Sequence, residues 1–97
     1  MASHSHELHN LNDLREYISQ ILCQSNELQP GAFPMTEHVL VRSGRPCGMY
    51  FCLHGPRSVK LSAIWESERN TVLFYSATGE RLHKTQLKRA PQLERVA

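Results

Sequence analysis

Three side chains that can bind metals or act as nucleophiles lie close together in the sequence, namely Cys47, Cys52 and His54. Two residues apart on a strand, Cys52 and His54 would point to the same side of a sheet. A structural zinc site needs four ligands and usually starts from a C-x2-C pair, which this sequence does not contain. We therefore interpret Cys52 as a half-buried thiol beside a histidine at a strand end, with a metal site as the alternative.

A second metal-binding pattern lies at the N-terminus, where removal of Met1 would leave Ala2-Ser3-His4 followed by His6. The free amine, two amides and the imidazole of such a terminus form a square-planar nitrogen set that suits Cu(II) or Ni(II). Any terminus with histidine in third place offers the same ligands. We therefore expect a polar tail here, keep the His4 and His6 metal site as an alternative, and predict no cofactor.

The residues needed for catalysis do not come together in the sequence. Cys52 and His54 have no identifiable third partner, and Asp13 is the only aspartate in the chain. Ser58 lacks the flanking glycines of a nucleophile elbow. We predict that the chain is not an enzyme.

The charge is unevenly distributed along the chain. Residues 1–38 hold one basic and five acidic side chains, whereas residues 39–97 hold ten basic and four acidic ones. Most of these charges are expected to be solvated, but the basic half could bind an anion. The candidate anion-binding residues are Arg42, Arg45, Arg57 and Lys60. With Tyr50 and Tyr75 stacking on bases, this half of the chain could bind RNA or single-stranded nucleic acid.

The element that precedes these residues is predicted to be an amphipathic helix. Its apolar positions recur at steps of three and four, and they are Leu11, Leu14, Ile18, Ile21 and Leu22. Asn10 is suited to cap the N-terminus of this helix. Pro30 and Gly31 predict that the helix ends by about Leu28.

Beyond Pro34 the sequence changes to short β-prone runs separated by glycine, proline and asparagine. The predicted strands are Glu37–Arg42, Met49–His54, Val59–Glu66, Thr71–Ser76 and Arg81–Leu87. Their connections are too short for a crossover helix, so neighbouring strands should be antiparallel. We thus predict an α+β fold in which one N-terminal helix packs on one face of a four- to five-stranded antiparallel meander. Residues 10–88 form the domain, between a flexible histidine-containing tail at 1–9 and an irregular tail at 89–97.

Alternation assigns side chains to the two faces of this sheet. The face placed under the helix carries Met49, Phe51, Leu53, Val59, Leu61, Ala63 and Trp65. If Glu66 pairs with Thr71, then Trp65 lies opposite Val72, and Ile64 lies opposite Leu73 on the other face. The predicted interface on that other face consists of Tyr50, Cys52, Ile64, Leu73 and Tyr75, with Lys60, Glu66, Arg81 and His83 as its charged rim.

An apolar surface of this kind is seldom left in water. The leading hypothesis is therefore a non-enzymatic binding or adaptor module that acts through its sheet as a homodimer or with another protein. Nucleic-acid binding is the alternative, and a small-molecule or metal-binding domain is the second alternative. No stretch approaches the roughly 18 to 20 apolar residues that span a bilayer. With a polar N-terminus and an odd number of cysteines, we expect a cytoplasmic protein that does not bind membranes.

Overall fold

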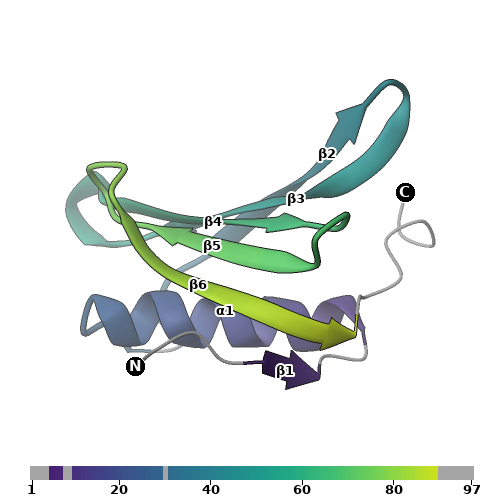
Figure 1. Cartoon of the computed structure of the whole chain (residues 1–97). Coiled ribbons are helices and arrows are strands. Elements are labelled where there is room, and N and C mark those ends of the chain that lie inside the picture. Colours follow the sequence, from purple (N-terminus) through teal and green to yellow (C-terminus); the bar gives the residue numbers. More distant parts are fainter. Residues whose placement is uncertain (1–4, 8–9, 30, 90–97) are drawn as a thin grey trace.

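The computed structural model describes residues 5–7, 10–29 and 31–89, and in this part of the chain one helix lies against one face of a six-stranded sheet (Figure 1). The elements are β1 (Ser5–Glu7), α1 (Leu11–Ser25), β2 (Met35–Arg42), β3 (Arg45–His54), the short 3-10 helix η1 (Pro56–Ser58), β4 (Lys60–Glu66), β5 (Thr71–Tyr75) and β6 (Arg81–Arg89). The strand order is β1-β6-β5-β4-β3-β2. Strands β2 to β6 pair antiparallel, which confirms the predicted α+β fold and its meander.

Strand β1 lies within the segment that we expected to be a flexible tail. Ser5–Glu7 pair parallel to β6, next to Gln86 and Leu87. Such pairing uses backbone groups, so three polar residues can form a strand without any apolar alternation in the sequence. At the other end, Arg89 belongs to β6, and residues 90–97 of the predicted C-terminal tail lie outside the described residues.

The N-terminus of α1 is the one that the sequence predicts. The helix begins at Leu11, and the Asn10 side chain accepts a hydrogen bond from the Asp13 backbone N–H at 2.9 Å. This bond satisfies one of the free N–H groups of the first turn. The buried residues of α1 are Leu11, Leu14, Ile18, Leu22 and Cys23.

The helix ends at Ser25, within the predicted limit of about Leu28. Glu27 adopts a positive φ of 56°, and the Leu28 N–H donates to the Cys23 carbonyl oxygen at 2.8 Å. A left-handed residue with this backward hydrogen bond is the Schellman motif, which closes a helix without proline. The helix thus already ends before Pro30, which lies outside the described residues.

The core lies between α1 and the sheet, with the predicted register. Trp65 pairs with Val72, Ala63 pairs with Phe74, and all four residues are fully buried. The largest buried side chain is that of Trp65, which is 0% exposed. Its predicted position under the helix is thus confirmed.

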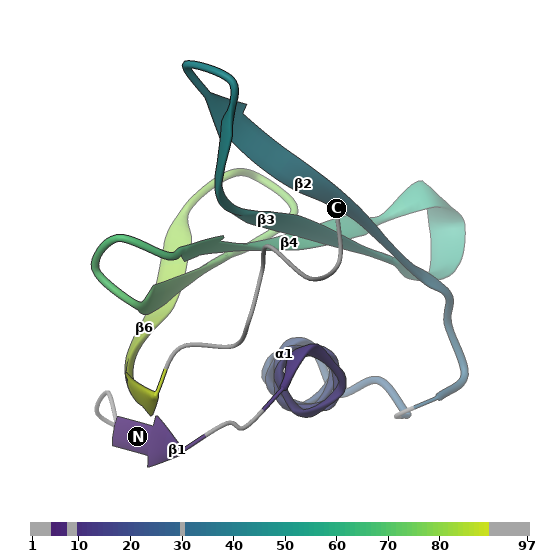
Figure 2. The ribbon, with the colours of Figure 1, turned by 90° about the vertical axis from the view of Figure 1, so that its right-hand side faces the viewer.

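Two polar contacts hold α1 over the sheet, one on each side. Arg15 forms a bidentate ion pair with Glu37 of β2, with Nε–Oε1 at 2.6 Å and Nη2–Oε2 at 2.7 Å. The Tyr17 hydroxyl hydrogen-bonds to Thr85 Oγ1 of β6 at 2.6 Å. Figure 2, which views the molecule along α1, shows the helix beneath the sheet with β1 and β6 to one side.

In the described part of the chain, no helix is long and apolar enough to cross a membrane.

Candidate functional site

All five predicted interface residues lie on the sheet face that α1 does not cover. Tyr50 pairs with Ile64, and Ile64 pairs with Leu73, so these three form one row across β3, β4 and β5. Cys52 and Tyr75 lie in the neighbouring row, where both pair with Ser62. We call the surface made by Tyr50, Cys52, Ile64, Leu73 and Tyr75 the open face.

The side chains of the open face are partly accessible. Tyr50, Ile64, Leu73 and Tyr75 are half-buried, and Cys52 is 6% exposed. Directly paired residues of an antiparallel sheet lie close enough for their side chains to contact each other, so each covers part of its neighbour. On the open face the apolar side chains are thus neighbours rather than isolated, with the polar Ser62 between Cys52 and Tyr75.

Charged side chains border the open face. Lys84 pairs with Leu73 at the end of the central row, and Arg81 pairs with Tyr75 at the end of the next row. Lys60 and Glu66 occupy the two ends of β4. His38 of β2 pairs with Tyr50 and closes the central row on the other side.

His83, which we predicted to belong to this rim, lies instead on the helix side of the sheet. It pairs with Phe74, and the two ring centroids are 5.5 Å apart. It also borders a small hollow together with Ile21 and Gln24 of α1. The reason is an irregularity in the pairing of β5 and β6, where Phe74 pairs with His83 but Tyr75 pairs with Arg81. Because this step skips one residue of β6, Arg81 and His83 lie on opposite faces of the sheet rather than on the same face.

The four candidate anion-binding residues lie at two distant places. Arg42 and Arg45 pair with each other beside the turn of the β2–β3 hairpin. Arg57 lies in η1 and Lys60 begins β4, so this pair is at the other end of β3. All four side chains are exposed, and the structure does not bring them together in one site.

The candidate metal ligands are also dispersed. Cys52 and His54 share one side of β3, where His54 Nε2 is 2.9 Å from Thr36 Oγ1. The backbone of His6 lies in β1, at the opposite edge of the sheet from β2, and His4 lies outside the described residues. Among the residues that the structure describes, no group of three or more His, Cys, Asp or Glu side chains could hold a metal ion.

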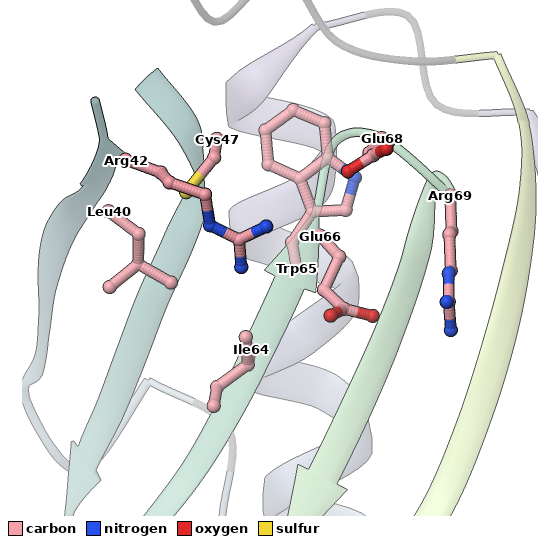
Figure 3. Close-up of a pocket in the computed structure, with 8 residues that line it drawn as sticks. All are labelled: Leu40, Arg42, Cys47, Ile64, Trp65, Glu66, Glu68 and Arg69. Carbon is pink, nitrogen blue, oxygen red and sulfur yellow. The ribbon is translucent and has the colours of Figure 1, made fainter. Parts of the chain in front are cut away.

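A pocket of about 240 Å³, which the sequence did not predict, lies at the edge of the open face (Figure 3). It opens between the β2–β3 hairpin and the β4–β5 turn. The lining residues are Leu40, Arg42, Cys47, Ile64, Trp65, Glu66, Glu68 and Arg69. Apolar and charged groups of both signs therefore face the same hollow.

Gly48 explains why the sheet is hollow at this point. It lies between Leu40 and Glu66 in a row across three strands, and it contributes no side chain to that row. A Cβ atom at this position would overlap the Trp65 carbonyl oxygen, so β3 can approach β4 only because residue 48 is glycine. A glycine inside a strand is a signal of such close approach, and it could have marked the pocket in the sequence.

The charged side chains of the pocket are not engaged with one another. Within the described part of the chain, the side chains of Arg42, Glu66, Glu68 and Arg69 make no hydrogen bond or ion pair. Figure 3 shows the Arg42 guanidinium extending from β2 across the neighbouring strand towards the side of Glu66. A cation and an anion are thus both available to a molecule in the pocket.

Comparisons with protein-family models, with curated proteins and with solved structures give no match for this chain.

Proposed function

We propose that this chain is a non-catalytic binding module that works through its open face, and that its partner there is a second copy of the chain. The observation that supports this proposal is the apolar row Tyr50, Ile64 and Leu73, which is flanked by Cys52 and Tyr75 on either side of Ser62. Monomeric proteins rarely expose contiguous apolar patches larger than a few hundred Å². Two such sheets can bury this surface by packing face to face.

The charges around the open face support a two-fold arrangement. Glu66 belongs to the row on one side of the central row, and Arg81 belongs to the row on the other side. If a two-fold axis runs across the strands, the row of Glu66 in one copy lies over the row of Arg81 in the second copy. The acidic side chain of one copy then approaches the row that carries a basic side chain in its partner.

Sedimentation equilibrium at micromolar concentration tests this proposal. The wild-type chain should sediment as a dimer, and Ile64→Lys or Leu73→Lys should sediment as folded monomers, with folding checked by circular dichroism. Val41→Lys is the matched control, because Val41 is 62% exposed on β2 outside the open face. A monomeric wild type, or dimers that persist in both open-face variants, would contradict the proposal.

Single-stranded nucleic acid is the second candidate partner. Tyr50 and Tyr75 lie on the open face, and Arg81 and Lys84 end the same two rows, so stacking and phosphate neutralisation could act side by side. Binding of an oligouridylate should then weaken steeply with salt, and Tyr50→Ala should weaken it by about 1–3 kcal/mol. Val41→Ala is the control, because Val41 is exposed and lies outside the open face. A monomeric chain with such binding would favour this candidate over the dimer.

We further propose that the module works in the cytoplasm. Cys23, Cys47 and Cys52 are all free thiols, which suits a reducing compartment. Fractionation of the source cells, followed by trapping of the thiols with an alkylating reagent, would test this assignment.

A further inference from the structure

We propose that the pocket between the β2–β3 hairpin and the β4–β5 turn binds a small zwitterion, an amino acid with an apolar body. Its carboxylate binds Arg42, and its ammonium group binds Glu66. This inference goes beyond the proposed dimer, because it concerns a separate ligand at the edge of the open face.

The size and the apolar part of the pocket set the kind of ligand. At about 240 Å³ the hollow is smaller than the pockets that hold drug-sized molecules, which start at roughly 300 Å³. Leu40, Ile64 and Cys47 supply an apolar lining. A short aliphatic body fits this lining, whereas a nucleotide or a sugar phosphate is too large and too polar for it.

The charges of the pocket select a molecule that carries both signs. Arg42 can bind a carboxylate through two parallel hydrogen bonds. Glu66 and Glu68 would repel a ligand that carries only a carboxylate, and Arg42 and Arg69 would repel one that carries only an amine. A zwitterion instead gains an interaction with a basic side chain and another with an acidic side chain.

The gap at Gly48 keeps these two charges accessible from the same hollow. Leu40 and Glu66 are separated only by Gly48 in their row, and any larger residue there would collide with Trp65. The Arg42 guanidinium extends from β2 across the neighbouring strand towards the side of Glu66 (Figure 3). Within one copy of the chain, Arg42 and Glu66 make no ion pair among the described residues, so ligand binding breaks no ion pair of the monomer.

The test is a titration of the full chain with L-leucine and with ε-aminocaproate, monitored by the amide chemical shifts of the protein. The two amino acids differ in the distance between their ammonium and carboxylate groups. At least one should bind, with the shifts centred on the pocket. Arg42→Gln and Glu66→Gln should each weaken that binding by about tenfold or more, because a hydrogen bond to a charged group is lost. Arg45→Gln is the matched control, since Arg45 is exposed on the same hairpin but does not line the pocket.

Two analogues of leucine assign the charges. Isocaproate lacks the ammonium group, so it should bind more weakly than leucine and should not be weakened further by Glu66→Gln. Isopentylamine lacks the carboxylate, so Arg42→Gln should not weaken it. The proposal is overturned if neither amino acid binds at millimolar concentration, if Arg45→Gln acts like Arg42→Gln, or if isocaproate binds as well as leucine. The sedimentation test of the wild-type chain needs no ligand, so it decides the proposed dimer separately from these outcomes.

Discussion

Asn70, in the turn between β4 and β5, has a positive φ of 49° and uses both ends of its amide. Its Oδ1 accepts a hydrogen bond from Trp65 Nε1 at 3.0 Å, and its Nδ2 donates to the Leu87 carbonyl oxygen at 3.1 Å. Asparagine tolerates the left-handed backbone better than most residues. This residue therefore closes a turn, pairs a buried indole N–H and attaches β6.

Substitution of Asn70 separates its backbone role from its side-chain role. Asn70→Gly keeps the left-handed backbone but leaves the Trp65 N–H unpaired, so we expect a loss of about 1–3 kcal/mol of unfolding free energy. Asn70→Ala should lose roughly another 1 kcal/mol, because a Cβ disfavours positive φ. Urea unfolding followed by Trp65 fluorescence measures both. If the two variants were equally stable, the backbone strain at this position would be negligible.

Tyr17 is the residue of α1 whose protonation is coupled to packing. Its ring contacts Phe74 edge to face, with centroids 6.1 Å apart, and its hydroxyl reaches Thr85. Burial raises the pKa of Tyr17, and the hydrogen bond with Thr85 lowers it by a smaller amount. The neutral phenol is therefore favoured in the folded protein.

The raised pKa of Tyr17 predicts a loss of stability in alkaline solution. A group whose pKa is higher in the folded state stabilises fully below its unfolded pKa, which is about 10 for tyrosine, and loses this contribution as the pH rises through the folded value. Tyr17→Phe should be less stable by about 1 kcal/mol at neutral pH, because its hydrogen bond is lost, but its stability should fall less steeply above about pH 10. Guanidinium unfolding across this range measures both slopes. Identical slopes would show that Tyr17 does not contribute.

At the scale of elements, alternation and turn length were sufficient to predict the centre of the sheet. The pairing of β4 with β5 followed from joining Glu66 to Thr71 around a short turn, and a register error of one residue would have put Trp65 in water. The same periodicity placed all five residues of the open face together. Each of these conclusions rests on side chains that must be buried or covered.

The features that were not predicted depend on the backbone instead. Strand β1 pairs without any apolar residue in Ser5–Glu7, and the irregularity after Phe74 leaves no clear composition signal, so His83 was assigned to the wrong face. The pocket results from close approach at Gly48 and from where two separate turns meet in space. None of these follows from hydrophobic periodicity alone.

The C-terminus of α1 gives a prediction for a single element. Glu27 holds the left-handed position of the Schellman motif, which glycine occupies at lower cost. Glu27→Gly should stabilise the protein by up to about 1 kcal/mol, since the Cβ penalty of roughly 1–2 kcal/mol exceeds the entropy cost of glycine. Thermal unfolding would show this as a higher Tm. A lower Tm would mean that the Glu27 side chain makes a contribution that outweighs its strain.

For the whole molecule, the arrangement is two layers with one core. α1 is tied to β2 by Arg15 and Glu37 and to β6 by Tyr17 and Thr85, so its orientation over the sheet is fixed from both sides. The Glu37 hydrogen bond raises the pKa of Arg15. Like any arginine, Arg15 is charged throughout the physiological range, so the ion pair persists there. With one face of the sheet covered by α1, the proposed binding would use the open face and the pocket beside it.

Trp65 is the residue on which this two-layer arrangement depends most. Trp65 is 0% exposed and pairs with Val72 on β5 and Met49 on β3. Its backbone carbonyl oxygen lies next to Gly48, at the pocket. Trp65→Ala should cost about 3–5 kcal/mol, the usual penalty for emptying a large buried aromatic site. A domain of this size has only about 5–15 kcal/mol of stability, so the variant should lose a large fraction of it.

The measurement for Trp65→Ala is urea unfolding followed by circular dichroism, because the variant has no tryptophan fluorescence. Leu82→Ala is the control, since Leu82 is 45% exposed on β6 and its loss should change stability by no more than about 0.5 kcal/mol. Trp65→Phe should fall between the two, because it keeps an aromatic ring but loses the hydrogen bond to Asn70. If Trp65→Ala were no more destabilising than Leu82→Ala, the core could not lie between α1 and the sheet, and the assignment of the open face would fail with it.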